Sequence, residues 1–311
     1  MHQRLLAIIL LSFAVSSAHA QGVAVARLQI TDTSNHKYTG WVGYVDLANY
    51  ETSFQPVVRG SACEHCGQFP SVTLLDTKTF SLSSPNMVVA ITANSGLALP
   101  KYANGLCAST ADGLIISDGT LVNPPGYQGP VLYFPMNGSP AITSDPWPAL
   151  STIRWAVAGS TITNNDCPCG QLGTLLVSNG TAGACAVPKP TIRAARGAAG
   201  LTEKGVLILA IVQGTEGSSG MTTAQFAQLM IDLGARNAVN FDGGGSTAFI
   251  WNPHGLQLIE EGSLHTLVVS GGGFTVTPVW QSVRSEFNVP SCTTCTTYRP
   301  VYASLGIQLV K

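Results

Sequence analysis

The sequence has little charge and no cluster of charge of one sign. Asp, Glu, Lys and Arg together make up 10% of the 311 residues, and the formal net charge is −1. No basic patch is present that would attract nucleic acid, and there is no acidic tail. The low charge does not indicate disorder, because hydrophobic residues make up 45% of the chain.

Long hydrophobic runs are also missing after residue 20. A membrane-spanning helix needs about 18 to 20 apolar residues, and no later run reaches that length. The early apolar stretch from Leu5 to Val15 follows Arg4 and precedes Ala18-His19-Ala20, which is typical of a secretory signal with its cleavage site. The sequence therefore predicts a signal peptide over 1–20 and a secreted or periplasmic protein that begins at Gln21. An uncleaved N-terminal anchor is the alternative.

All eight cysteines follow the predicted cleavage site. They are Cys63, Cys66, Cys107, Cys167, Cys169, Cys185, Cys292 and Cys295. Their even number and the oxidising compartment predict disulfide bonds. The two Cys-x-x-Cys motifs are the alternative, because together they would supply four thiolates for zinc. The spacing does not give the pairing.

The first half of the mature chain predicts short strands and turns. Strand candidates are 23–30, 40–47, 55–60, 71–82 and 86–96. Asp118-Gly119 lies between two apolar runs, which predicts a tight hairpin, and Asn137-Gly138 predicts another turn. The 33 glycines and 18 prolines agree with a fold rich in strands and turns.

The second half predicts a strand, a helix and a strand. Residues 205–214 are a continuous apolar run bounded by glycine, typical of a buried strand. Thr222 and Gln225 have capping-box spacing at the start of a helix over 222–233, and Gly234 ends it. We expect an α+β fold with a mixed β-sheet core and few helices. A strand-rich N-terminal extension over 21–84 packs on a domain over 85–311.

The most informative stretch is the turn after the strand at 237–241. Asp242 is followed by Gly243, Gly244 and Gly245, and then by Ser246 and Thr247. Consecutive glycine amides form anion-binding nests, and hydroxyls add further donors, so this pattern suits a phosphate beside a carboxylate. A plain hairpin turn that Asp242 caps with its own side chain is the alternative.

This stretch, NAVNFDGGGSTAFI, resembles the signature of the phosphodiester glycosidase family. Other blocks resemble the family in the same order over roughly 85–311: VVAITANSG, ADGLIISDGTLV, ARGAAGLTEKGVLILAIVQG, GMTTAQFAQLMIDLGA and YRPVYASLGIQLV. The resemblance implies Asp242, Arg196 and Arg299 as catalytic residues. It implies Asn94, Asn240, Gly243, Gly244, Gly245, Ser246 and Thr247 as substrate-binding residues. The chain departs from the family at Ala195 and Gly197, where the family has Pro and Thr, and 282–296 looks like an insertion.

The resemblance implies an exported hydrolase that cleaves a sugar-1-phosphodiester at the anomeric bond. Its substrate would be a glycosyl phosphate or a polysaccharide, and no cofactor would be needed. The arginines would neutralise the phosphate, and the Asp242 carboxylate would act on water or on the anomeric centre. Two alternatives remain: a non-catalytic exported protein of the same fold that binds or assembles carbohydrate or exopolysaccharide, and a Ca²⁺ site at Asp242. Each arginine, taken alone, would also suit a structural ion pair.

Overall fold

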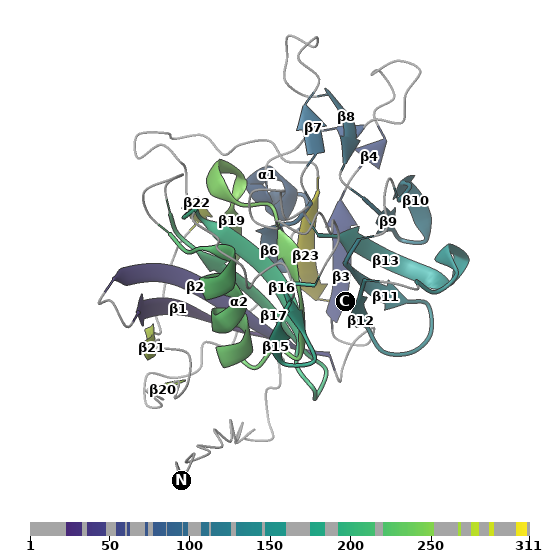
Figure 1. Ribbon diagram of the computed structural model, residues 1–311. Helices are drawn as coiled ribbons and strands as arrows, with labels where there is room; N and C mark the ends of the chain where they lie inside the picture. Colours follow the sequence, from purple (N-terminus) through teal and green to yellow (C-terminus); the bar gives the residue numbers. More distant parts are fainter. Residues whose placement is uncertain are drawn as a thin grey trace.

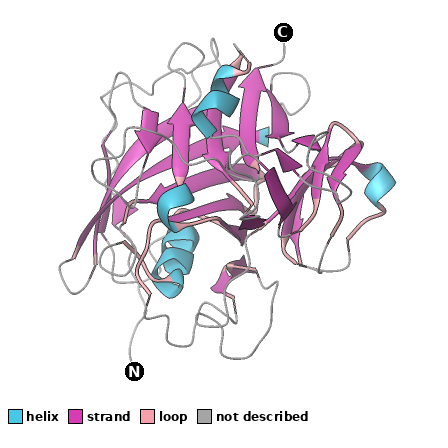
Figure 2. Cartoon of the chain, turned by 90° about the horizontal axis from the view of Figure 1, so that it is seen from above, coloured by secondary structure: helices cyan, strands magenta, loops and turns pink. Residues whose placement is uncertain are grey.

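The strands form four sheets with few helices, as the sequence predicts (Figures 1 and 2). The computed structural model describes residues 23–32, 36–47, 54–59, 61–62, 72–73, 77–84, 86–94, 96–98, 107–111, 113–125, 129–144, 147–159, 175–183, 192–214, 220–251, 267–268, 275–279, 286–288 and 303–309. Every strand pair among them is antiparallel, so neighbouring strands alternate in direction throughout the described sheets.

The largest sheet has nine strands in the order β15-β14-β18-β16-β17-β2-β1-β21-β20. Their bounds are β15 Thr181–Ala182, β14 Val177–Ser178, β18 Asn237–Phe241, β16 Arg196–Leu201, β17 Val206–Val212, β2 Lys37–Asp46, β1 Val23–Thr31, β21 Thr275–Val279 and β20 Leu267–Val268. The helix α2 (Thr223–Asp232) covers one face of this sheet (Figure 1). The other face packs on a second sheet.

That second sheet has the order β22-β19-β6-β23-β3, with β22 Glu286–Asn288, β19 Ala248–Trp251, β6 Met87–Thr92, β23 Ser304–Leu309 and β3 Phe54–Arg59. The third has the order β10-β9-β13-β11-β12, with β10 Thr120–Asn123, β9 Ile115–Ser117, β13 Ile153–Ala158, β11 Val131–Pro135 and β12 Ala141–Thr143. The fourth has the order β4-β5-β8-β7, with β4 Ser61–Ala62, β5 Val72–Thr73, β8 Cys107–Ala111 and β7 Gly96–Ala98.

One hydrophobic core joins the first three sheets. Trp41 of β2 stacks on Trp251 of β19 with ring centroids 4.5 Å apart, and the same core includes Trp155 of β13. Gly43 allows this close packing, because a Cβ there would lie 3.2 Å from the Phe249 ring. A second core lies between the nine-stranded sheet and the buried face of α2.

The strands of the predicted N-terminal extension belong to the same sheets as later strands. β2 pairs with β17 over seven residue pairs from Val206↔Asp46 to Val212↔Gly40, and β3 pairs with β23. The N-terminal residues therefore form part of both main sheets. The boundary near residue 84 stays a prediction.

Several local predictions are confirmed. α2 begins with a capping box between Thr222 and Gln225, and Gly234 follows it with φ +98°. Asp118 and Gly119 both have positive φ in the hairpin between β9 and β10, as an Asp-Gly turn of this kind requires. β17, α2 and β18 follow in the expected order of strand, helix and strand, and β16 lies between the two strands in the sheet.

The strand expected over 71–82 is wrong in its second half. β5 covers Val72–Thr73, but α1 (Thr77–Leu82) is a helix. Thr77, Thr79 and Phe80 favour strands by local propensity. Tertiary packing reverses that preference, because the helix places Phe80 in a small buried cluster with Met87 and Ala90.

Two further predictions concern residues that the structure places only in part or not at all. Cys107 lies in β8 by its backbone, and the other seven cysteines lie outside the described residues, so the disulfide and zinc hypotheses both stay predictions. The signal segment also lies outside them. Among the described residues, none of the helices has the length and apolar composition needed to cross a membrane.

Candidate functional site

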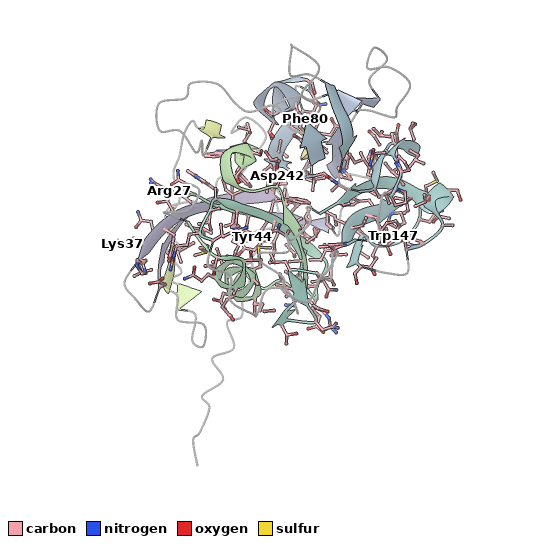
Figure 3. The ribbon with its side chains drawn as sticks, turned by 45° about the horizontal axis from the view of Figure 1, so that its top comes forward. Arg27, Lys37, Tyr44, Phe80, Trp147 and Asp242 are labelled. Atoms are coloured by element: carbon pink, nitrogen blue, oxygen red, sulfur yellow. The ribbon has the colours of Figure 1, made fainter. Side chains whose placement is uncertain are left out.

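The predicted turn connects the two main sheets. β18 of the nine-stranded sheet ends at Phe241, a short 3-10 turn covers Gly244–Ser246, and β19 of the second sheet begins at Ala248. Figure 3 shows Asp242 near the centre of the molecule, between Phe80 of α1 and Tyr44 of β2. The carboxylate therefore lies where the chain passes from one sheet to the other.

Two of the glycines are needed for different reasons. Gly244 has φ +59°, a conformation that side-chain-bearing residues rarely adopt. Gly243 has an extended backbone, but a Cβ there would lie 2.8 Å from the carbonyl oxygen of Ala195. The turn therefore needs positive φ at one position and close backbone approach at the other.

Short backbone hydrogen bonds tie this turn to two other segments. The amide of Asp242 donates to the carbonyl of Ala93 at 2.7 Å, and the amide of Gly244 donates to the carbonyl of Ala195 at 2.9 Å. Ala93 precedes Asn94, and Ala195 precedes Arg196. Three motifs that lie far apart in the sequence thus meet at one place, and each brings a predicted site residue.

Most turn amides donate within the protein. The amide of Gly243 donates to Oδ1 of Asp242 at 2.9 Å, so Asp242 caps its own turn, as in the plain-turn interpretation. The amides of Ser246 and Thr247 donate at 3.3 Å to the carbonyls of Gly243 and Gly244. These amides and that of Gly244 are therefore not the donors of the expected anion nest in this structure.

Arg196 is held beside the turn by two backbone carbonyls. It is the first residue of β16, and the next residue, Gly197, pairs with Phe241, which precedes Asp242. Nε donates to the carbonyl of Met221 at 3.1 Å, and one terminal nitrogen donates to the carbonyl of Ile192 at 2.9 Å. The guanidinium is thus fixed in orientation, close to the strand end that carries Asp242.

The other predicted site residues differ in burial and in their hydrogen-bond partners. Asn94 is fully buried, and Nδ2 donates to the carbonyl of Ala158 at 3.2 Å. Oδ1 of Asn240 and Oγ1 of Thr247 are buried and have no hydrogen-bond partner among the described residues. Gly245 and Ser246 lie in the 3-10 turn. Arg299 lies outside the described residues, so the structure does not test whether it joins the site.

Sequence reasoning missed a set of buried hydroxyls beneath the turn, which we call the hydroxyl chain. It consists of Ser304, Thr77 and Thr92. Oγ1 of Thr77 lies 3.1 Å from Oγ of Ser304 and 2.9 Å from Oγ1 of Thr92, and Thr92 donates to the carbonyl of Ser246 at 2.7 Å. Thr77 and Ser304 are 227 residues apart, so no local pattern signals the contact.

Sequence reasoning also missed a charged cluster behind Arg196, formed by Asp32, Tyr38 and Arg193. The hydroxyl of Tyr38 donates to Oδ2 of Asp32 at 2.7 Å and accepts from Nη1 of Arg193 at 2.7 Å. Arg193 also donates to the carbonyl of Gly220. The cluster therefore fixes the segments before Arg196 and before α2, whose carbonyls hold the Arg196 guanidinium.

The cluster shifts the acidities of both its acidic groups. Burial alone would raise the pKa of Asp32, but hydrogen bonds from Tyr38 and from the amide and ring of His36 outweigh it and hold that pKa below its usual value. Burial and the bond to the Asp32 carboxylate raise the pKa of Tyr38. Asp32 is thus an anion, and Tyr38 a neutral donor, near neutral pH.

No group of three or more His, Cys, Asp or Glu side chains among the described residues is arranged to hold a metal ion. A Ca²⁺ site at Asp242 would need main-chain oxygens, amide oxygens or water as further ligands.

The comparisons with known proteins agree with the motifs. The family model for phosphodiester glycosidases matches residues 86–277. Among curated proteins, none matches the chain. The fold is similar to the catalytic domain of zebrafish N-acetylglucosamine-1-phosphodiester alpha-N-acetylglucosaminidase, auto-inhibited by its pro-peptide, with a TM-score of 0.59 and 18% identity over 94% of this chain and 85% of that one.

A hypothetical protein from Synechocystis has a similar fold, with a TM-score of 0.54 and 13% identity over 92% of this chain and 62% of that one. At such identities the two solved structures show the fold alone. The family match covers more than half of this chain, and it contains Asn94, Arg196 and Asp242, whose three segments are joined by backbone hydrogen bonds at the turn. The chain therefore belongs to the phosphodiester glycosidase family.

Proposed function

We propose that this chain is an exported hydrolase that cleaves a sugar-1-phosphodiester at the anomeric bond. The observation that carries the proposal is the meeting of three motifs, in which the Asp242 amide bonds to the residue before Asn94 and the Gly244 amide bonds to the residue before Arg196. A cation and a carboxylate at one strand end supply what this reaction requires.

In the proposed reaction, water adds to the anomeric carbon and the bond from that carbon to the phosphate oxygen breaks. The electron pair leaves with the phosphate monoester, which is a good leaving group, so a second carboxylate acting as an acid is not required. Arg196 binds the phosphate, with Arg299 as the second cation. Asp242 orients or deprotonates the water and stabilises positive charge at the anomeric centre. Ser246 would orient the sugar, and the buried Asn94, Asn240 and Thr247 would hold the turn in place.

The test is a hydrolysis assay on sugar-1-phosphodiesters that differ in sugar and in aglycone, run in ¹⁸O-labelled water. Anomeric cleavage places the label in the sugar, whereas cleavage at phosphorus places it in the phosphate. Asp242→Asn should lower kcat by ~10²–10⁴-fold, the scale expected for a positioned acid or base. Asp118→Asn is the matched control, since Asp118 lies in an exposed hairpin turn. Label in the phosphate, or full activity in Asp242→Asn, would overturn the proposal.

A substitution of Arg196 tests whether its guanidinium binds the phosphate. Arg196→Lys keeps the charge but loses the fork, so we expect weaker binding and slower turnover together, because the phosphate is charged in the ground state as well. Arg236→Lys is the control, because Arg236 pairs with Glu203 at an exposed turn. We expect activity to survive chelation of divalent metal ions. Loss of activity with EDTA and its recovery with Ca²⁺ would favour the Ca²⁺ alternative.

The second candidate function is non-catalytic binding of an exopolysaccharide. It is favoured by Arg196, whose guanidinium is engaged by two carbonyls, and by the departures at Ala195 and Gly197. Binding of glycosyl phosphates with no turnover across the whole panel would support it. Intact mass of the exported protein tests the predicted start at Gln21, and a mass that retains residues 1–20 would contradict it.

A further inference from the structure

The hydroxyl chain has a defined direction. Each hydroxyl has one hydrogen to donate, and a carbonyl oxygen can only accept. The hydrogen of Thr92 must therefore point to the carbonyl of Ser246. Thr77 must then donate to Thr92, and Ser304 must donate to Thr77, because three bonds share three hydrogens.

The members of the hydroxyl chain are buried and lie on regular secondary structure. Thr92 and Ser304 are directly paired residues of β6 and β23, and Thr77 begins α1. All three side chains are buried, with at most 3% of their surface exposed. α1 is anchored by Phe80 and lies close to β23, because a Cβ on Gly306 would be 3.0 Å from the Phe80 ring.

The bond to Ser246 complements the backbone bond to Asp242. The Asp242 amide donates to the Ala93 carbonyl at 2.7 Å, and Thr92 donates to the Ser246 carbonyl, also at 2.7 Å. The two backbone–backbone bonds inside the turn are both 3.3 Å long. The last residue of β6 and the residue after it thus hold both ends of the turn by bonds shorter than its internal backbone bonds.

We propose that Thr92 and Thr77, with Ser304 at the far end, are positioning residues that hold the carboxylate of Asp242 in its reactive place through the carbonyl of Ser246. This inference rests on the proposed function. Hydroxyl donors in series polarise one another, so the last bond is strengthened by those behind it. The direction of the chain also ranks its members. Loss of Thr92 removes the bond to the turn, loss of Thr77 weakens it, and loss of Ser304 weakens it least.

The test compares Thr92→Val, Thr77→Val and Ser304→Ala with a matched control, Thr181→Val. Thr181 donates to the carbonyl of Ser178 at 2.7 Å in an exposed turn of the first sheet. We expect kcat on the best sugar-1-phosphodiester to fall ~10–100-fold in Thr92→Val with KM within about 3-fold, since a small misplacement of a reacting group has this scale of effect. The losses should decrease in the order Thr92, Thr77, Ser304, and Thr92→Ser should restore most of the activity.

A second measurement keeps the inference independent of the substrate. The amide of Thr247 shares a peptide plane with the Ser246 carbonyl, so its ¹⁵N and ¹H chemical shifts should move in the same order in the three variants. Equal kcat losses in all three variants, a loss in KM alone, or unshifted Thr247 signals would overturn the positioning role. A wild-type protein that hydrolyses nothing on the panel refutes the proposed function, and the positioning role with it, even where the Thr247 shifts follow the predicted order.

Discussion

Two polar networks support the candidate site, and they are built from different chemistry. The hydroxyl chain beneath the turn contains no ionisable group and ends on the Ser246 carbonyl. The charged cluster behind Arg196 is centred on the Asp32 carboxylate, with Tyr38 as its donor and Arg193 beyond it. The hydroxyl chain therefore supports the turn of Asp242 through neutral groups, whereas the charged cluster supports the segments whose carbonyls hold the Arg196 guanidinium.

This difference has a physical consequence for the site. A second carboxylate or cation beneath the turn would repel or attract the charge of Asp242, because charges within a few ångströms interact strongly in a buried environment. Neutral hydroxyls fix the turn without adding a charge beside that carboxylate. The guanidinium of Arg196 stays protonated in any case. Charged groups in the cluster beside it therefore do not change its protonation state.

The largest expected effect comes from the Tyr38 hydroxyl, which links Asp32 to Arg193 in the charged cluster. Tyr38→Phe removes the donor to Asp32 and the acceptor for Arg193 while leaving the ring in place. We expect the free energy of unfolding at pH 7 to fall by about 1.5–3 kcal/mol, the range for hydrogen bonds to charged groups. Urea unfolding measures this. Tyr44→Phe in the same strand is the control, since its hydroxyl makes a 3.4 Å bond to the Leu233 carbonyl and its loss should cost under about 1 kcal/mol. Equal losses in the two variants would contradict the central role of Tyr38.

The second prediction is that the stability costs of substitutions in the two networks depend differently on pH. The pKa of Asp32 is lowered in the folded protein, so its stabilisation is fully present above the unfolded value of 3.8 and is lost as pH falls through the lower folded value. The cost of Tyr38→Phe should therefore fall to roughly half in acid below that window, because charge-assisted bonds are about twice as strong as neutral ones. The cost of Thr92→Val should stay constant over the same range. Parallel pH profiles would show that both networks act as neutral ones.

The same comparison shows what the sequence could predict. Thr222 and Gln225, or Asp118 and Gly119, are close neighbours along the chain, and their side-chain chemistry sets the local backbone, so the helix start and the hairpin were predicted correctly. The position of Asp242 at the end of a strand was predicted for the same reason, because an apolar run followed by three glycines is a local signal.

The supports of the site depend instead on contacts across the chain. Arg193 meets Tyr38 across 155 residues, and Thr92 meets Ser246 across 154. A threonine in a strand is explained by its β-propensity alone, and an Asp, Tyr or Arg far from its partner gives no local signal. Neither network could therefore be recognised from the sequence. α1 was mistaken for a strand for a related reason: its helical state depends on the burial of Phe80 by Met87 and Ala90, which its own residues do not encode.

The smallest expected effect concerns a half-buried carboxylate, that of Asp232, which has fewer hydrogen-bond donors than Asp32. Asp232 is the last residue of α2, where the negative end of the helix dipole opposes its charge. Oδ1 accepts from Nε2 of Gln228 at 2.8 Å, but Oδ2 is buried with no hydrogen-bond partner among the described residues. Burial raises the pKa of Asp232 to about 6, and the Gln228 bond only partly opposes the shift.

A raised folded pKa on an acid reverses the pH dependence found for Asp32. Between 3.8 and about 6 the folded state binds more protons than the unfolded state, so stability from this group rises as pH falls through that window. Asp232→Asn keeps the acceptor for Gln228 and removes the charge. It should raise the free energy of unfolding by about 0.5–1 kcal/mol at pH 8, the scale of a charge at a helix end, and by nothing at pH 4. Urea unfolding at both pH values checks this. A gain of equal size at both would mean that packing, rather than charge, distinguishes Asp232 from the well-supported Asp32.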